Sequence, residues 1–188
     1  MGARTPPGTG NTLADALAQR RAATAEGEAA RPETILLIGL QGSGKSTFYR
    51  ERFFATHVRI NLDMLRTRRR ETLLLDACLE GTIPFVVDNT NATLAVRERY
   101  LVLARAAGFR CTGYYLDVPL ALCLARNAAR PPGERVPSVG IYGTRKRLQP
   151  PTLTEGFDAL YRVTVGGDGA LTVAPYTKDE QHIATDRA

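Results

Sequence analysis

The chain has 188 residues, 44% of them hydrophobic, and this length and composition suit one folded domain with a single substantial core. No apolar run approaches the roughly 18 residues of a membrane span and no signal-peptide pattern is present, so we expect a cytoplasmic protein without membrane contact. The formal net charge of +6 favours a polyanionic partner such as nucleic acid, although many basic proteins bind none. Cys78, Cys111 and Cys123 are odd in number and far apart, which argues against both a disulfide framework and a thiolate metal site.

The two ends of the chain differ in composition from its centre. Residues 1–31 are rich in Ala, Gly, Thr, Pro and Arg and predict a flexible arm, in which residues 14–23 could form a weakly docked helix. Residues 177–188 are polar and predict a tail that frays. The folded domain is therefore expected to span residues 32–176.

Within that domain, apolar runs short enough for strands alternate with longer stretches of helical period. This alternation predicts an α/β fold with a mostly parallel sheet and helices on both faces. The expected strands are residues 35–40, 58–60, 84–88, 110–116 and 161–165, and a turn at 166–169 is expected to join two final strands. The expected helices are residues 45–54, 65–80, 94–107, 119–128 and 139–148.

The stretch LLIGLQGSGKSTF fits the phosphate-binding pattern G-x-x-x-x-G-K-[ST] between a strand and a helix. Its glycines let backbone N–H groups converge on phosphate oxygens at the positive end of the following helix. Lys45 is expected to pair with phosphate charge and Ser46 to ligate Mg²⁺, so the motif predicts binding of ATP or another nucleoside triphosphate. The expected nucleotide-binding residues of this loop are Gly39, Gly42, Ser43, Gly44, Lys45, Ser46 and Thr47.

The stretch INLDMLR follows the second expected strand, close to where an α/β sheet places its ligand crevice. Phosphoryl transfer to a hydroxyl needs a carboxylate near the attacking oxygen and cations around the phosphoryl group. Asp63 is the candidate general base, and Arg66, one helical turn later, is the candidate clamp for an acceptor phosphate. The alternative is an aspartate that stabilises a helix dipole beside a solvated arginine.

Two further polar segments are candidates for substrate contact. Asp88 and Asn89, in PFVVDNTN, end a buried strand and could orient an arginine, a metal-bound water or the substrate, although a plain turn would use the same residues. The run RTRRR, residues 66–70, could follow a nucleic-acid backbone or form a solvated face. The expected substrate-binding residues are Arg66, Arg70, Asp88 and Asn89.

Arg126 and Arg130, in CLARNAAR, are four residues apart on one helix face, and the following PPGERVP ends the helix. This arrangement predicts a lid whose arginines reach over the donor phosphates and stabilise transition-state charge. Two solvated arginines complementing a helix C-terminus are the alternative.

In this order, five segments resemble the kinase domain of polynucleotide 5′-hydroxyl kinases of the animal type. They are GLQGSGKSTF, INLDMLR, VVDNTNATLAVRERYLVLARAAG, ARNAAR and VPSVGIYGTRKRLQPPTLTEGF. The resemblance implies a P-loop kinase fold with an arginine-bearing lid that phosphorylates 5′-hydroxyl ends of DNA or RNA during end repair. One departure is Leu62, because the family usually has an arginine between this asparagine and aspartate.

The resemblance also implies residue roles. Lys45 and Ser46 would bind donor phosphates and Mg²⁺, and Asp63 would activate the 5′-hydroxyl. Arg66 would hold an acceptor phosphate, and the lid arginines would engage the donor. The expected catalytic residues are Asp63, Lys45, Arg66 and Arg130.

Neither the D-x-D-x-T motif of the family's phosphatase modules nor the K-x-D-G motif of its ligase modules occurs in the sequence. We therefore expect a kinase module that works beside a separate 3′-phosphatase or ligase. Two other functions stay open at this point. One is a P-loop kinase for a small-metabolite or tRNA-linked acceptor, and the other is a nucleotide-dependent binding module that transfers no phosphate to its partner.

Overall fold

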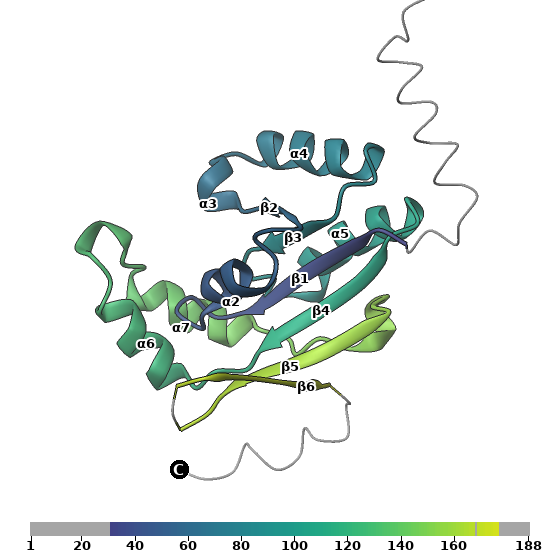
Figure 1. Ribbon diagram of the computed structural model, residues 1–188. Helices are drawn as coiled ribbons and strands as arrows, with labels where there is room; N and C mark the ends of the chain where they lie inside the picture. Colours follow the sequence, from purple (N-terminus) through teal and green to yellow (C-terminus); the bar gives the residue numbers. More distant parts are fainter. Residues whose placement is uncertain (1–30, 168, 177–188) are drawn as a thin grey trace, which may run out of the picture. The chain divides into compact units, whose positions relative to one another are not determined.

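A six-stranded sheet forms the centre of the computed structural model, which describes residues 31–167 and 169–176 (Figure 1). The strand order is β2-β3-β1-β4-β5-β6, and neighbouring strands run parallel except for the antiparallel pair of β5 and β6. The strands are β1 (Glu33–Gly39), β2 (Val58–Ile60), β3 (Phe85–Asp88), β4 (Arg110–Leu116), β5 (Ala159–Val165) and β6 (Leu171–Pro175).

Helices connect the parallel strands and lie on both faces of the sheet (Figure 1). The α-helices are α2 (Lys45–Arg52), α3 (Leu62–Leu65), α4 (Arg68–Glu80), α5 (Leu94–Ala106), α6 (Leu120–Ala128) and α7 (Ser138–Arg147). Two short 3₁₀ helices are η1 (Pro132–Glu134) and η2 (Leu153–Glu155). Within the described ranges, no helix is both long enough and apolar enough to cross a bilayer.

Each face of the sheet carries its own half of the hydrophobic core. Leu36 and Ile38 of β1 pack with side chains of α4 and α5, whereas Ile35 and Leu37 pack with side chains of α2 and α6. The two sets alternate because successive side chains of a strand point to opposite faces. The predicted α/β fold, a mostly parallel sheet between two layers of helices, is confirmed.

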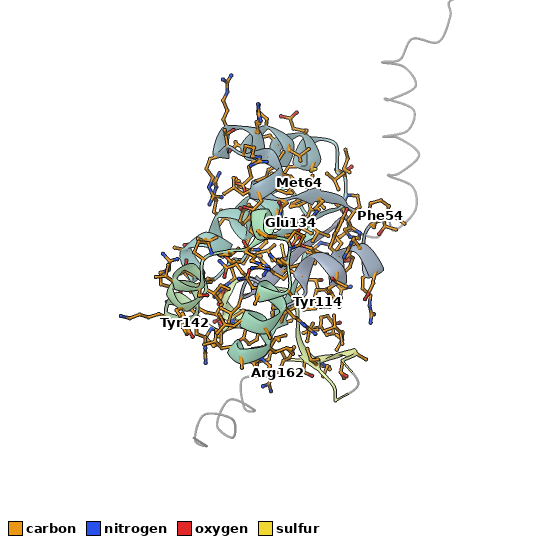
Figure 2. The ribbon with its side chains drawn as sticks, turned by 90° about the vertical axis from the view of Figure 1, so that its left-hand side faces the viewer. Phe54, Met64, Tyr114, Glu134, Tyr142 and Arg162 are labelled. Atoms are coloured by element: carbon orange, nitrogen blue, oxygen red, sulfur yellow. The ribbon has the colours of Figure 1, made fainter. Side chains whose placement is uncertain are left out.

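The carboxyl ends of β1 and β3 mark the point where a ligand crevice is expected. Leu37 of β1 pairs with Asp88 of β3 on one side and with Tyr114 of β4 on the other. The chain leaves β1 for α2 on one face of the sheet, but it leaves β3 for α5 on the opposite face. Such a divergence opens a crevice beyond the strand ends. Figure 2 looks onto this edge of the sheet.

Most expected elements are present, but the single helix expected over residues 65–80 is wrong. The chain forms α3 and α4 instead, separated by Arg66, whose φ of 69° is left-handed and ends α3. Thr67 then starts α4, because its side-chain oxygen accepts a hydrogen bond from the backbone N–H of Arg70. Arg66 consequently does not continue the helix that carries Asp63.

The sequence features at the two ends lie outside the described residues. These are the expected arm, of which the structure describes Arg31, the helix expected over residues 14–23, and the expected tail at 177–188. The three cysteines, Cys78, Cys111 and Cys123, are described, and all are buried.

Candidate active site

The loop between β1 and α2 has the backbone of a phosphate-binding turn. Gly42 and Gly44 have φ values of 79° and 99°, which glycine adopts without strain. A Cβ atom on Gly42 would collide with the backbone carbonyl of Cys123 in α6, so the tight turn and the packing of α6 both require glycine here. Gly44 is the N-cap of α2 and offers no side-chain cap to the N–H groups of its first turn. These are the groups that bind phosphate in such loops.

The other predicted loop residues are placed around this turn. The backbone N–H of Gly39 donates to the carbonyl of Thr90 at 3.0 Å, which ties the loop to the segment after β3. Ser43 is buried, and its N–H donates to the carbonyl of Leu40 at 3.2 Å. Thr47 is exposed on the first turn of α2.

Lys45 is buried inside the loop with its charge directed at backbone carbonyls. Its Nζ donates to the carbonyl oxygens of Gly39 at 3.0 Å and Leu40 at 2.7 Å. Burial lowers the pKa of its ammonium group to about 8, against the opposing effect of Asp88. The lysine is therefore held at the centre of the turn, where phosphate oxygens would compete with the carbonyls for its protons.

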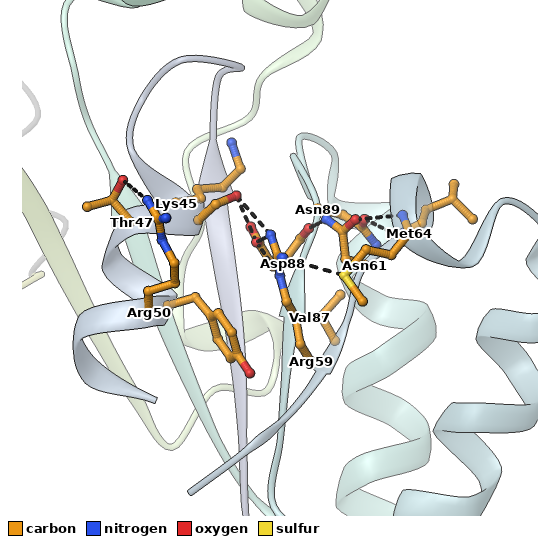
Figure 3. A network of polar contacts seen from close by, with 12 residues as sticks. Lys45, Thr47, Arg50, Arg59, Asn61, Met64, Val87, Asp88 and Asn89 are labelled. Atoms are coloured by element: carbon orange, nitrogen blue, oxygen red, sulfur yellow. Dashed lines mark hydrogen bonds and ion pairs between the residues drawn. The ribbon is translucent and has the colours of Figure 1, made fainter. Parts of the chain in front are cut away.

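Ser46 of α2, Arg59 of β2 and Asp88 of β3 form a closed network of hydrogen bonds (Figure 3). Ser46 Oγ donates to Asp88 Oδ2 at 3.0 Å, and Arg59 Nε donates to the same oxygen at 2.9 Å. Arg59 Nη2 donates to Ser46 Oγ at 3.0 Å, and the guanidinium lies 5.2 Å from the ring centroid of Tyr49. The adjacent hydroxyl and carboxylate oxygens fit Mg²⁺, which prefers oxygen ligands and usually keeps several waters and phosphate oxygens.

Arg59 is a functional candidate that the sequence analysis missed. The predicted options for Asp88 included orienting an arginine, and the structure pairs it with this one. Arg59 and Asn61 alternate along the chain with the buried Ile60. Because side chains alternate along a strand, this pattern could have shown that Arg59 and Asn61 point away from the core that buries Ile60.

Asn61 and Asn89 fix the short helix that carries Asp63 (Figure 3). Asn61 caps α3 by accepting from the N–H of Met64 at 3.0 Å, and its Nδ2 donates to the backbone carbonyl of Asp88. Asn89 Oδ1 accepts from the N–H of Leu62 at 2.9 Å. The first turn of α3 is thus tied to the carboxyl end of β3. Asp63 itself is exposed and has neither a hydrogen bond nor an ion pair among the described residues.

Asp63 lines two adjoining cavities. The smaller one, about 160 Å³, is called the loop cavity, and the larger one, about 510 Å³, is called the α3–α7 cavity. The loop cavity is lined by Gln41, Gly42, Gly44, Lys45, Ser46, Thr47, Asn61, Asp63, Asp88, Asn89, Thr90, Arg130 and Val136. The α3–α7 cavity is lined by Gln41, Leu62, Asp63, Arg68, Asn89, Thr90, Asn91, Ala92, Thr93, Val96, Tyr100, Val136, Thr144 and Arg147.

The segment between α6 and α7 is a loop closed at its base. The side chain of Asn127 donates to the carbonyl of Val136 at 2.8 Å and accepts from its N–H at 3.0 Å. Arg135 Nε donates to the carbonyl of Arg130 at 2.7 Å within this loop. In Figure 2, Glu134 of this segment and Met64 of α3 both lie on the side where the parallel strands end. This is the segment for which a lid was expected, and we refer to residues 126–136, which include both arginines, as the lid.

Both predicted lid arginines line a third cavity of about 560 Å³, called the lid cavity. Arg126 lies beside Gly44, since a Cβ atom there would be 3.7 Å from Arg126 Nη1. Arg130 lines the lid cavity and the loop cavity alike. The lid cavity is lined by Gly42, Gly44, Thr47, Glu51, Arg126, Arg130, Gly169, Ala170 and Leu171.

Two predicted substrate contacts are not brought to these cavities. Arg66 and Arg70 are exposed and line none of the three, and Arg70 Nη1 donates to the carbonyl of Leu65 at 3.4 Å. Arg68, between them, lines the α3–α7 cavity, as does Arg147 at the end of α7. Arg68 and Arg70 are two residues apart on α4 and therefore point to different faces, whereas Arg66 lies in the break between α3 and α4.

A buried ion pair lies next to Asn91, a residue that lines the α3–α7 cavity. Arg97 of α5 is fully buried and binds Glu155 with two hydrogen bonds, of 2.6 and 2.7 Å. Its remaining nitrogen donates to the carbonyls of Asn91 at 3.0 Å and Gln149 at 3.1 Å. Arg97 therefore fastens the segment of 149–155 to the segment that follows β3.

The phosphate-binding loop after β1, with Ser46 and Asp88 beside it at the carboxyl edge of a mostly parallel sheet, is the arrangement of a P-loop kinase-like domain. The chain belongs to the AAA domain family, whose sequence model matches residues 34–151, well over half of its length.

One curated protein is similar to this chain in sequence, and solved structures are similar to it in fold. The bifunctional polynucleotide phosphatase/kinase of Schizosaccharomyces pombe is 26% identical over 129 residues, covering 66% of this chain and 32% of that protein. The chain thus spans about a third of the length of this curated relative. Solved structures of the AvrRxo1-ORF1:AvrRxo1-ORF2 complex with ATP and of a Sinorhizobium meliloti gluconokinase share the fold. The first has a TM-score of 0.61 at 16% identity and covers 81% of this chain and 60% of that chain. The second has a TM-score of 0.50 at 19% identity, and the match covers 72% of this chain and 84% of the gluconokinase.

Proposed function

We propose that this domain transfers the γ-phosphoryl group of ATP to the 5′-hydroxyl end of DNA or RNA. The observation that carries the proposal is the position of Asp63, which lines the loop cavity and the α3–α7 cavity at once. A carboxylate at that border would meet an acceptor on one side and a donor phosphate on the other. The similarity to the Schizosaccharomyces pombe polynucleotide phosphatase/kinase supports a polynucleotide acceptor.

The donor would occupy the loop cavity and the lid cavity. The phosphates would lie on the loop N–H groups with Lys45 between them, and the nucleoside would lie between the lid and residues 169–171. Arg130 lines both cavities and would meet charge on the transferred group, while Arg126 lies beside the loop at Gly44. Ser46 and Asp88 would hold Mg²⁺, which neutralises charge on the β- and γ-phosphates when it is bound.

The transfer itself is a single displacement. The 5′-oxygen of the acceptor attacks the γ-phosphorus, and its proton passes to the Asp63 carboxylate. A new phosphorus–oxygen bond forms to the acceptor while the bond to the β-phosphate oxygen breaks, and ADP leaves with that electron pair. Asp88 is a weaker candidate for the base, because its Oδ2 already accepts hydrogen bonds from Ser46 and Arg59.

The acceptor strand would enter the α3–α7 cavity. Arg68 and Arg147 reach this cavity from α4 and α7, and each could bind a phosphodiester of the strand. Leu62 lines the same cavity, at the position where polynucleotide 5′-hydroxyl kinases usually have an arginine. Arg68 would supply the positive charge that Leu62 lacks. Arg66 and Arg70, exposed on the same segment, would meet the strand farther from its end.

End-labelling tests the proposal directly. The protein would be incubated with ATP and Mg²⁺, in separate reactions with matched DNA and RNA oligonucleotides bearing a 5′-hydroxyl or a 5′-phosphate, and with a panel of sugars. We expect transfer to 5′-hydroxyl oligonucleotides alone. Asp63→Asn should bind ATP normally but lose at least about 100-fold in turnover, whereas Asp76→Asn, an exposed aspartate on α4, should behave as the unchanged protein. Transfer to sugars alone would make the chain a metabolite kinase, and release of free phosphate alone would make it a nucleotide-driven binding module.

A further inference from the structure

A buried carboxylate stands behind the α3–α7 cavity. Glu71 of α4 is 0% exposed, although a carboxylate is costly to bury without partners. It accepts hydrogen bonds from Arg68 Nη1 at 2.7 Å, from Tyr100 OH at 2.8 Å and from Asn89 Nδ2 at 3.1 Å. Arg99, on the exposed face of α5, adds a longer ion pair at 3.8 Å. The carboxylate is thus satisfied by donors from three different segments.

The partners of Glu71 contact both the α3–α7 cavity and the start of α3. Arg68, Tyr100 and Asn89 all line the α3–α7 cavity. Asn89 uses its amide nitrogen for Glu71 and its amide oxygen for the N–H of Leu62, the residue before Asp63. One carboxylate therefore holds a cavity arginine directly and holds the start of α3 through a single intervening side chain.

The hydrogens of this network stay in place over the working pH range. Burial, with the hydrogen bond to Glu71, raises the pKa of the Tyr100 phenol to about 12, so the phenol remains a donor at neutral pH. The hydrogen bond to Glu71 raises the pKa of Arg68 as well. Tyr100 and Arg68 therefore both remain hydrogen-bond donors to Glu71 at neutral pH.

We infer that Glu71 is the positioning residue of the acceptor site, where it aims Arg68 at a phosphodiester of the strand and holds the Asp63 helix through Asn89. This role rests on the proposed function. It couples strand binding to placement of the base, because both depend on the same carboxylate. A purely structural Glu71 would affect stability, lower the apparent kcat only in proportion to the folded fraction, and leave KM for the oligonucleotide unchanged.

The first test separates strand binding from turnover. Arg68→Gln should raise KM for a 5′-hydroxyl oligonucleotide about tenfold with little change in kcat, and KM for ATP should stay as it was. The slope of log affinity against log salt should become shallower by about 0.7, because one single-strand phosphate contact is lost. Arg110→Gln, an exposed arginine at the amino end of β4, is the matched control and should change none of these values.

The second test addresses Glu71 itself. Glu71→Gln should raise the oligonucleotide KM and also lower kcat about tenfold, because the link from Asn89 to α3 loosens. Added to Arg68→Gln, it should raise KM by much less than the product of the separate effects, since both variants remove the same arginine contact. Tyr100→Phe removes one donor without burying a new polar group, and it should give a smaller change of the same kind. Glu98→Gln, exposed on α5, is the control.

The outcomes distinguish this inference from the proposed function. No transfer to any oligonucleotide by the unchanged protein would reject the proposed function, and with it the inference. Normal transfer with an unaltered oligonucleotide KM in Arg68→Gln would reject the inference alone. The inference would also be overturned if Glu71→Gln and Tyr100→Phe, both folded by thermal unfolding, kept the kcat of the unchanged protein. If Glu71→Gln does not fold, Tyr100→Phe and Arg68→Gln decide.

Discussion

Nucleotide binding should place a proton on Lys45. Burial lowers the pKa of its ammonium group to about 8, so about three quarters of these side chains would be neutral at pH 8.5 in the free protein. A bound polyphosphate strongly favours the charged form. Binding should therefore take up about 0.75 proton at pH 8.5, but only about 0.1 proton at pH 7, where the lysine is already charged.

Isothermal titration calorimetry measures this uptake. ADP would be titrated at pH 7 and at pH 8.5, each in two buffers of different ionisation enthalpy, and the difference in heat gives the number of protons. The terminal phosphate of ADP has a pKa near 6, so it contributes little to the proton uptake at pH 8.5. Lys146→Met removes an exposed lysine of α7 and should leave the uptake unchanged, whereas Lys45→Met should abolish it. Equal uptake at both pH values, or uptake that persists in Lys45→Met, would refute the reasoning.

Unfolding of the free protein gives an independent measure of the same pKa. A lysine whose pKa is lower in the folded state destabilises the fold fully below that pKa, and the cost is relieved between pH 8 and 10.5. Relative to Lys45→Met, the free energy of unfolding should rise by about 3 kcal/mol across this interval. Chemical denaturation at a series of pH values would record it.

Three further variants test the surroundings of the loop. Gly42→Ala should abolish nucleotide binding and lower the free energy of unfolding by about 2 kcal/mol or more, since its methyl group meets the carbonyl of Cys123 at a positive φ; calorimetry and denaturation would measure both. Arg59→Gln should leave the buried carboxylate of Asp88 unpaired, so the melting temperature should fall and be restored in part by millimolar Mg²⁺, read by scanning fluorimetry. Asn127→Ala should remove both hydrogen bonds to Val136, cost about 1–3 kcal/mol, raise KM for ATP several-fold and speed amide exchange in the lid.

Each of these variants has a control in the chain. Gly167→Ala adds a methyl group where no atom lies within 4 Å, so equal damage by it and by Gly42→Ala would count against the steric argument. Arg110→Gln is the control for charge removal, and a comparable Mg²⁺ rescue there would contradict the proposed balance at Asp88. For the lid, the predicted exchange should be confined to residues 128–136, and a uniform increase over the domain would indicate general destabilisation instead.

The sequence predicts the sheet and the phosphate loop well because both depend on local patterns. β1 is a run of apolar residues that ends at Gly39, and β2 and β4 match their expected ranges. The split of the helix expected over residues 65–80 was also encoded locally. Asn61 and Thr67 are both good N-caps, six residues apart, and two starts so close require a stop between them. That stop is Arg66, a residue that rarely adopts a positive φ, so no composition rule marks it.

Residues that act through long-range contacts were beyond local patterns. Glu71 reads as a polar residue in the first turn of a helix, and its burial depends on Tyr100 and Asn89, which lie 29 and 18 residues away. Arg59 is similar, because its partner Asp88 is 29 positions later. Such groups become visible only when the register of the sheet is known. Arg126 and Arg130 were proposed from a contiguous motif and its resemblance to polynucleotide kinases; both line the lid cavity, and their role stays a prediction.

Asp63 lies where the loop cavity adjoins the α3–α7 cavity, and under the proposed function this arrangement sets the expected kinetic scheme. A nucleotide approaching along the lid and a strand approaching past α4 and α7 would not obstruct one another, so either could arrive first. Initial-rate plots should then show intersecting lines, as in a random-order ternary-complex mechanism, rather than the parallel lines of a ping-pong enzyme. A spent nucleotide could likewise be exchanged while the phosphorylated strand is still held.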